Sequence, residues 1–213
     1  MSVSQGLYDL LGPESAHQGW EALDLSSQNL KRHNVDAHDN AALSRYIFNG
    51  NIRYGGYGER RDIYSRSENY SEAENERNIH LGVDVWAPAD TPIYAPWSGT
   101  LVVSHLNAGD ADYGPTLIIK HRVGKEIILA LYGHLSISSL SIHPVGTEIE
   151  KGALIAYLGN ERENGGWPPH LHFQLIRELD SDAVDYPGVC SAKDWDYYAK
   201  NCPDPMSYLP LEG

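Results

Sequence analysis

The sequence lacks any long apolar run. No stretch approaches the roughly 20 consecutive apolar residues that a membrane-spanning helix needs, and the first 20 residues have neither the basic start nor the hydrophobic stretch of a signal peptide. We therefore expect no membrane span. As written, the chain is expected to be cytoplasmic, and a periplasmic or secreted location is expected instead if a leader has been removed.

Positive charge is also scarce. The chain has 16 Lys and Arg against 29 Asp and Glu, which gives a formal net charge of -13. Such a charge repels nucleic acid and anionic lipid surfaces. Nucleic acid is therefore not expected as a partner, and nothing in the sequence indicates the oligomeric state.

There are only two cysteines, Cys190 and Cys202, and both lie near the C-terminus. A zinc ribbon would need four ligands at closer spacing. The pair could form a disulfide or remain as two reduced thiols, and the sequence favours neither.

The remaining composition favours one domain of β structure. The 213 residues include 20 Gly and 12 Pro, which is typical of short elements joined by turns. Alternating or apolar segments separated by turn-forming residues predict strands over 83–87, 92–95, 100–105, 116–121, 126–132, 153–158 and 171–176. No helices are expected between these strands, so we predict an all-β fold, a compact antiparallel β-sheet or sandwich.

The flanking segments have different patterns. Residues 1–50 are predicted to be a short helical N-terminal extension, with a helical turn over Leu7–Leu11 and a helix that begins at Asp39 and ends at Gly50. Residues 53–78 show no sustained period and predict a long loop. Residues 136–140 are expected to form one helical turn. We expect the domain to span 51–178 and an irregular tail, 179–213, to pack on it.

A His-x-His pair lies on the last predicted strand. Side chains two apart on a strand point the same way, so His170 and His172 present two imidazoles side by side, which suits a metal. His80 and Asp84 form a second pair where the strand pattern begins. Four extended residues cover about 13 Å, so Gly82 must let the chain bend if both are to bind one ion. The alternative is an exposed histidine beside an aspartate that caps a turn.

His134 ends another apolar strand and could be a satisfied edge residue. Taken together, however, His80, Asp84, His134, His170 and His172 all lie at strand ends or on one strand face. Catalytic zinc takes three protein ligands and leaves a position for water, so this set is sufficient. The other histidines that we considered are expected to be solvated or structural: His33, His38, His105, His121 and His143.

The order of these motifs resembles the lysostaphin-type (LytM-like) zinc endopeptidases. The resemblance rests on His80-x-x-x-Asp84, Tyr132-Gly133-His134-Leu135, a hairpin between Val145 and Gly152, and Pro169-His170-Leu171-His172-Phe173, and it covers about residues 79–177. It implies a compact antiparallel sheet with a narrow groove, and hydrolysis of peptide bonds in peptidoglycan stem or cross-bridge peptides.

Carried over by position, the resemblance implies that His80, Asp84 and His172 hold one zinc ion per chain. His134 and His170 would flank the water without binding the metal, and the sequence does not decide which of them is the general base. Gln174 stands where the family usually has an acidic residue; it could orient His172, pack or be exposed.

Several further residues could line the groove. Tyr113 and Trp167 could do so or be packed in the core, and four residues of the long loop could reach the site as oxyanion donors: Arg60, Arg61, Tyr64 and Tyr70. Two other classes of function compete with the enzyme. One is a non-catalytic binding or activator module of the same fold, which would lack some of the five residues; the other is a phosphotransfer or carrier domain, which would need two facing histidines without the His80 and Asp84 pair.

Overall fold

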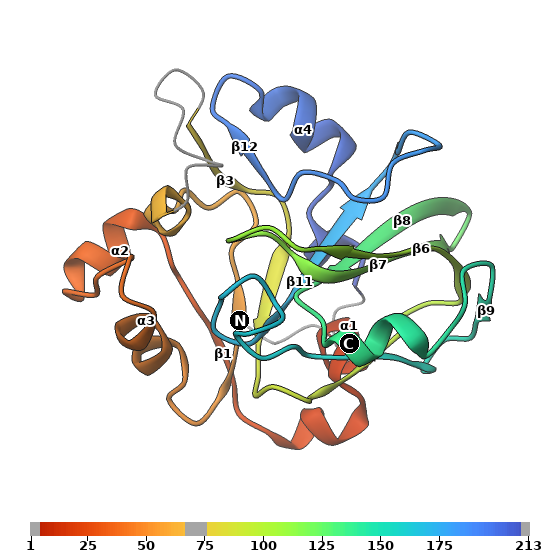
Figure 1. Cartoon of the computed structure of the whole chain (residues 1–213), viewed down its shortest axis with the longest axis horizontal. Coiled ribbons are helices and arrows are strands. Elements are labelled where there is room, and N and C mark those ends of the chain that lie inside the picture. Colours follow the sequence, from red (N-terminus) through yellow and green to blue (C-terminus); the bar gives the residue numbers. More distant parts are fainter. Residues whose placement is uncertain (1–4, 67–75, 210–213) are drawn as a thin grey trace.

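The computed structural model describes residues 5–66 and 76–209. Its main element is an eight-stranded sheet with the order β1-β2-β4-β11-β8-β7-β6-β9, in which every neighbouring pair is antiparallel except β1 and β2 (Figure 1). The strands are β1 (Trp20–Ala22), β2 (Ile52–Gly55), β4 (Val83–Trp86), β6 (Gly99–Asn107), β7 (Gly114–Val123), β8 (Glu126–Gly133), β9 (Glu148–Ile149) and β11 (His170–Ile176). The predicted antiparallel all-β fold is confirmed.

Two small sheets complete the β structure. Strand β5 (Pro92–Tyr94) pairs with β10 (Leu154–Tyr157), and β3 (Arg77–His80) pairs with β12 (Val189–Ser191). Both pairs are antiparallel. The second pair matters for the site, because β3 ends at His80.

The long strands β7 and β8 form a tight hairpin. Val123 pairs with Glu126, so the connection is the two-residue turn Gly124-Lys125, and Gly124 has a φ of 61°. Two-residue hairpin turns need such left-handed positions, which glycine adopts without strain. The hairpin ends at Gly133, immediately before His134.

Strand β11 lies near the middle of the sheet, between β4 and β8, and its seven residues are all buried. Leu171, Phe173 and Leu175 belong to the main hydrophobic core. Successive strand side chains point to opposite faces, so His170, His172 and Gln174 project from the other face. One strand therefore joins the core to a buried polar face.

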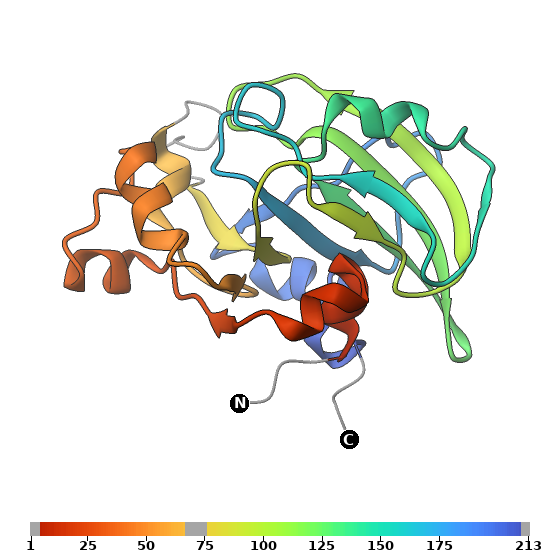
Figure 2. The same cartoon turned by 90° about the horizontal axis from the view of Figure 1, so that it is seen from below.

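The N-terminal 50 residues contain helices α1 (Gln5–Leu11), α2 (Ser27–Arg32) and α3 (Asn40–Ile47), and also strand β1. Asp39 caps α3 as predicted, since its carboxylate accepts hydrogen bonds from the backbone N–H groups of Ala41 and Ala42. The helix ends at Ile47 rather than at Gly50. Helices α2 and α3 lie at the opposite end of the molecule from β6 (Figures 1 and 2).

The predicted loop over 53–78 is partly wrong. Within it the structure has most of β2, a 3-10 helix η2 (Asp62–Arg66) and the first half of β3. Neither strand has the apolar content that marks the predicted ones, since β2 reads IRYG and β3 reads RNIH. Each is defined instead by pairing to a distant partner, β2 to β4 and β3 to β12. The other 3-10 helices are η1 (Pro13–His17), η4 (Ile137–Ser141), which confirms the helical turn expected there, and η5 (Pro205–Ser207).

The C-terminal segment is more regular than expected. Strand β12 and helix α4 (Trp195–Asn201) replace much of the predicted irregular tail. Cys190 and Cys202 are free, buried thiols in one apolar cluster. Burial raises the pKa of Cys190 to about 11 and that of Cys202 to about 12, so both thiols are protonated at neutral pH and poorly nucleophilic.

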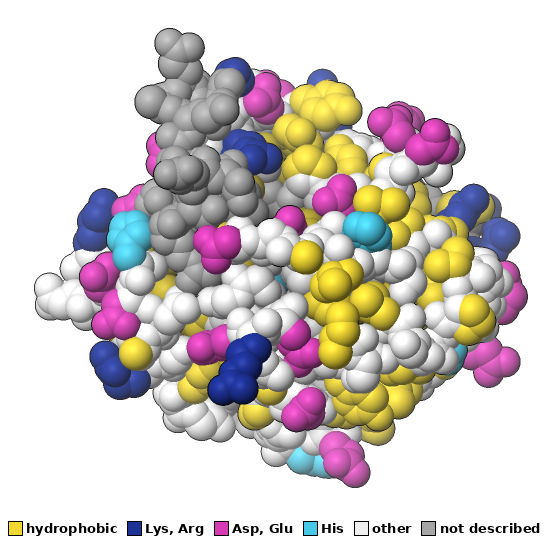
Figure 3. Space-filling model, in the orientation of Figure 1, with side chains coloured by type: hydrophobic (Ala, Val, Ile, Leu, Met, Phe, Trp, Pro, Cys, Tyr) yellow, Lys and Arg dark blue, Asp and Glu magenta, His cyan; other side chains and the backbone are white. Residues whose placement is uncertain are grey.

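The surface has no single basic face in the view of Figure 3. Among the side chains coloured there, Lys and Arg are scattered between acidic and hydrophobic ones. Within the described ranges 5–66 and 76–209, no helix combines the length and apolar character needed to cross a membrane.

Candidate metal centre

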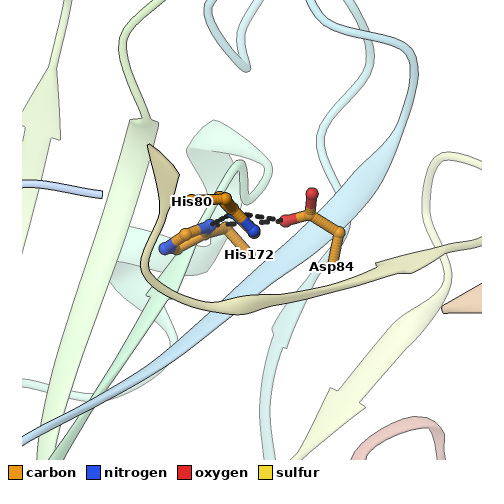
Figure 4. A group of neighbouring side chains, drawn as sticks. All are labelled: His80, Asp84 and His172. Carbon is orange, nitrogen blue, oxygen red and sulfur yellow. Dashed lines mark hydrogen bonds and ion pairs between the residues drawn. The ribbon is translucent and has the colours of Figure 1, made fainter. Parts of the chain in front are cut away.

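Three side chains from separate strands converge on one point. His80 ends β3, Asp84 lies in β4 and His172 lies in β11, directly opposite Asp84 in the register of the sheet. Nε2 of His80 lies 2.8 Å from Nδ1 of His172, and Oδ1 of Asp84 lies 3.3 Å from each of these nitrogens. Figure 4 shows both imidazoles and the carboxylate turned toward one another. All three residues are buried.

These distances suit a divalent cation. Zinc binds imidazole nitrogen and carboxylate oxygen at about 2.0–2.2 Å in tetrahedral sites, which places ligand atoms about 3.3–3.5 Å apart. The two distances of 3.3 Å to Asp84 match this spacing, and the distance of 2.8 Å between the imidazoles is shorter. The three residues can therefore hold one metal ion and leave a ligand position toward the cavity.

Gly82 makes the convergence possible. A Cβ atom at this position would lie 2.7 Å from Cε1 and 2.8 Å from Nε2 of His172, and 2.8 Å from the carbonyl oxygen of Phe173. Real Cβ atoms do not approach other heavy atoms so closely, so only glycine fits between the two ligand-bearing segments. The bend expected at Gly82 brings His80 and Asp84 to the same point.

Each of the three side chains also has a hydrogen-bond partner on its outer atom, the polar atom that faces away from the other two side chains. Nδ1 of His80 is 3.1 Å from the carbonyl oxygen of Gly56, and Nε2 of His172 is 2.9 Å from Oε1 of Gln174. The Arg61 guanidinium donates from Nη1 to Oδ2 of Asp84 at 2.6 Å. A hydrogen bond on the outer nitrogen fixes the proton there and leaves the inner nitrogen free to bind a metal. The outer contacts therefore direct all three inner atoms to one point.

The charge states of the site residues follow from burial and from one permanently charged group, the Arg61 guanidinium. Burial alone would raise the pKa of Asp84, but His80 and Arg61 outweigh it and hold this pKa well below its usual value. Burial lowers the pKa of His80 to about 3, against the opposing effect of Asp84. At neutral pH the carboxylate is ionised and the imidazole of His80 is neutral, as metal ligation requires.

His134 and His170 lie next to this group with their rings 4.2 Å apart. Nδ1 of His134 is 2.9 Å from the carbonyl oxygen of Asn164, and Nδ1 of His170 is 2.8 Å from that of Pro168. A carbonyl oxygen can only accept, so each Nδ1 carries a proton and each neutral ring presents an unprotonated Nε2. Nε2 of His170 lies 3.8 Å from Oδ1 of Asp84.

Both of these rings are held neutral. Burial lowers the pKa of His170 to about 4, and burial together with the neighbouring His170 and His172 lowers the pKa of His134 well below its usual value. His134 also has a φ of 62°, which is uncommon for a residue other than glycine. Its backbone is held there by a hydrogen bond from its N–H to the carbonyl of Tyr113 at 2.8 Å and by one from Gly159 N–H to its own carbonyl at 2.9 Å.

All five predicted residues line one cavity of about 380 Å³. Tyr113 and Trp167 also line it, although both are largely buried. Of the loop residues expected to reach the site, Arg61 and Tyr64 do so. Arg60 does not line the cavity, and Tyr70 lies outside the described residues.

The family model described as Peptidase family M23 matches residues 78–186, about half of the chain. The chain belongs to peptidase family M23. The matched residues contain all five residues of the site, four histidines and one aspartate.

Two curated relatives align with about half of this chain. An uncharacterized metalloprotease of Haemophilus influenzae is 34% identical over 115 residues, which are 53% of this chain and 22% of that protein. The DD-carboxypeptidase/endopeptidase Mpg of Neisseria meningitidis is 31% identical over 96 residues, 45% of this chain and 20% of that one. The chain thus spans about a fifth of the length of the curated relatives it matches. Among solved structures, the antimicrobial peptidase lysostaphin from Staphylococcus simulans has a TM-score of 0.47 at 21% identity, covering 78% of this chain and 52% of that one.

Some contributors to this M23 site were not predicted. The carbonyls of Gly56, Asn164 and Pro168 hold three of the histidines, and a backbone carbonyl has no signature in the sequence. Asn164 is a residue that the sequence could have indicated. Its side chain is fully buried and forms hydrogen bonds with Gly159 and Trp167. An asparagine followed by two glycines predicts a turn, and here that turn supports the M23 site.

We expect the metal-free protein to lose stability as the pH falls from 7 to 4. His80, His134 and His170 have pKa values below the value of about 6.5 that an unfolded chain has. The unfolded state therefore binds more protons below pH 6.5, and stability is present above that pH and declines below it. Each histidine contributes at most about 1.4 kcal/mol per pH unit. Thermal unfolding in the presence of a chelator measures this.

The matched control is the double variant His134→Gln and His170→Gln, which keeps polar side chains but removes two titrating groups. Its unfolding midpoint should depend less steeply on pH between 4 and 6.5 than that of the unaltered protein. Parallel curves for the two proteins would contradict the assignment of neutral, buried imidazoles.

Proposed function

We propose that the protein is a zinc metalloendopeptidase that hydrolyses peptide bonds, in peptidoglycan stem or cross-bridge peptides. The observation that carries the proposal is the convergence of His80, Asp84 and His172 beside two further neutral histidines in one cavity. Membership of peptidase family M23 supports it. The names of two relatives, a metalloprotease and an endopeptidase, agree with it.

Zinc is the metal that this ligand set favours. Two imidazole nitrogens and one carboxylate oxygen are a frequent three-ligand set for catalytic zinc, whereas magnesium and calcium prefer all-oxygen sites. Bound there, zinc would act as a Lewis acid on the scissile carbonyl and on the attacking water. We assign one zinc ion per chain.

His134 and His170 would handle the proton of the attacking water. Each ring presents an unprotonated Nε2 because its Nδ1–H is bonded to a backbone carbonyl, so each can accept a proton at Nε2. A ring that has accepted a proton becomes a donor that can stabilise developing negative charge on the carbonyl oxygen or protonate the leaving amine. The ring centroids lie 4.2 Å apart, and burial disfavours a charge on both rings at once, so one ring at a time would carry the proton taken from the water.

A peptide with charged groups suits the cavity. Asp112, Asp185 and Arg77 line it together with the aromatic rings of Tyr113 and Trp167. Carboxylates can bind a substrate amine and a guanidinium can bind a substrate carboxylate. Stem peptides carry both groups, which supports them as the substrate class.

We expect the purified protein to bind about one zinc ion per chain, and the two classes of histidine to separate on substitution. His172→Ala should abolish zinc binding and activity, because it removes a ligand. His134→Ala should retain the metal and lower kcat by about 10²–10⁴, the range for loss of a general acid or base. Metal content by elemental analysis and hydrolysis rates on the same preparations measure both effects.

A protein that cannot be loaded with zinc would refute the metal site. Equal loss of zinc in the two variants would show instead that His134 is a ligand and that the division of roles is wrong. The exposed His38 offers a control, since His38→Ala should change neither quantity.

Gln174→Leu should weaken zinc binding by about 10–100-fold, the usual effect of losing an outer partner of a ligating histidine. Oε1 of Gln174 accepts a hydrogen bond from Nε2–H of His172, and without it the ring is free to turn or to change tautomer. Gln174→Glu retains the acceptor and should preserve the affinity. Competition with a chromophoric chelator gives the dissociation constants, and an unchanged constant for the leucine variant would remove Gln174 from the site.

The substrate is tested by incubating the zinc-loaded protein with peptidoglycan, soluble muropeptides and glycine-rich peptides, followed by mass spectrometry. We expect new amine and carboxylate ends in stem or cross-bridge peptides, and none with the His134→Ala protein. Cleavage of glycine-rich peptides alone would confirm the peptidase activity and would change the proposed substrate to glycine-rich peptides. Binding without cleavage of any of the three would favour the non-catalytic module instead.

A further inference from the structure

The segment from Gly56 to Tyr64 precedes the residues matched to family M23, yet it reaches the centre of the site. Its most buried member is Arg61, whose side chain is 2% exposed. Nη1 of Arg61 donates to Oδ2 of Asp84 at 2.6 Å and to the hydroxyl oxygen of Tyr64 at 3.2 Å, and Nε donates to Oε2 of Glu59 at 2.5 Å. At such burial the three contacts lie away from bulk solvent.

The segment that carries Arg61 is tied to the strand that carries His80. The N–H of Gly58 donates to the carbonyl of His80, the N–H of His80 donates to the carbonyl of Glu59, and the N–H of Arg61 donates to the carbonyl of Asn78, all at 2.9–3.0 Å. The carbonyl of Gly56 meets the imidazole of His80. The guanidinium is therefore fixed relative to two of the three candidate ligands.

Position 56 is shaped for this arginine. A Cβ atom on Gly56 would lie 2.0 Å from Nη2 of Arg61 and 3.0 Å from Nδ1 of His80, and the residue has a φ of 106°. Both features require glycine. The backbone thus leaves room for the guanidinium beside the metal ligands.

The two oxygens of Asp84 have different surroundings. Oδ1 faces the nitrogens of His80 and His172 at 3.3 Å, whereas Oδ2 faces Arg61. An ionised carboxylate has about four lone-pair positions and can bind a metal through one oxygen or through both. A guanidinium on Oδ2 reserves that oxygen and leaves Oδ1 for the metal.

We propose that Arg61 is a positioning residue that holds Asp84 as a ligand through Oδ1 alone, and that Glu59 balances its charge. The inference rests on the proposed zinc site. Glu59 accepts from Arg61 through Oε2 and from the backbone N–H of Leu25 through Oε1, so the carboxylate is itself fixed. The Arg61 and Glu59 pair adds no net charge beside the metal, and what it supplies is the orientation of Asp84.

The test removes the pair as a unit, with the double variant Arg61→Met and Glu59→Gln. Deleting only one partner would leave the other as a buried, uncompensated charge, which is strongly destabilising. The double variant removes both of these charges and leaves Asp84 with its two imidazole neighbours. We expect zinc affinity to fall by about 10–100-fold. We also expect the visible spectrum of the cobalt-loaded protein to change in intensity, because the coordination of Asp84 changes.

The matched control is the double variant Arg53→Met and Glu21→Gln. Arg53 is also a buried arginine. It lies in β2, which pairs with the strand that carries Asp84, and its Nε lies 3.6 Å from Oε2 of Glu21, but it does not line the cavity. This control should keep the zinc affinity and the cobalt spectrum of the unaltered protein. Thermal unfolding of all three proteins in the presence of a chelator verifies that each one folds.

The outcomes separate this inference from the function on which it rests. An unaltered protein that binds no zinc would end the proposed function. If the unaltered protein binds zinc and the Arg61 double variant has the same affinity and spectrum, only the role of Arg61 is refuted. Tighter zinc binding by the double variant would refute it as well, since it would show that the guanidinium opposes the metal. An equal loss of affinity in the Arg53 double variant would reduce the effect to general destabilisation.

Discussion

The site depends on one buried carboxylate. Asp84 is 1% exposed, and an isolated carboxylate at such depth would cost several kcal/mol or would be protonated. It remains ionised because Arg61 lies 2.6 Å from one oxygen and two imidazoles surround the other. The guanidinium is in turn compensated by Glu59. A cation bound among the histidines would offset the one negative charge that Asp84, Glu59 and Arg61 together leave.

The core keeps these groups in register. In β11 the side chains of Leu171, Phe173 and Leu175 are packed in the main core, while His170, His172 and Gln174 project from the other face. A shift of one residue in pairing would exchange the two sets, burying imidazoles in the core and placing leucines at the site. The apolar packing of one face therefore fixes the position of the ligands on the other, as a site built on a rigid strand requires.

Sequence reasoning could reach the ligands because each belongs to a short local pattern. The alternation in 170–175 predicts a strand with both imidazoles on one face, and Gly82 predicts the bend between His80 and Asp84; the structure has both features. It could not reach strand β2 or β3, because these two strands have at most two apolar side chains each and are defined by partners more than 25 residues away. Nor could it find the carbonyls of Gly56 and Pro168 that fix the imidazoles, because every residue has a carbonyl. Arg61 was expected near the site, as an oxyanion donor, and the structure places it on Asp84 instead.

The residues matched to family M23 include the three candidate metal ligands but not all of the groups that orient them. Residues 78–186 include His80, Asp84 and His172, whereas the partners of His80 and Asp84, Gly56 and Arg61, come before that range. Gln174 lies inside it, but its amide donates to the carbonyl of Pro187 and lies 3.3 Å from the sulfur of Cys202, both beyond its end. Segments on both sides of the matched range therefore close over the same cavity. The segments before and after the matched range have the same physical role. Each supplies a buried hydrogen-bond partner to a polar group that the matched residues alone would leave unsatisfied.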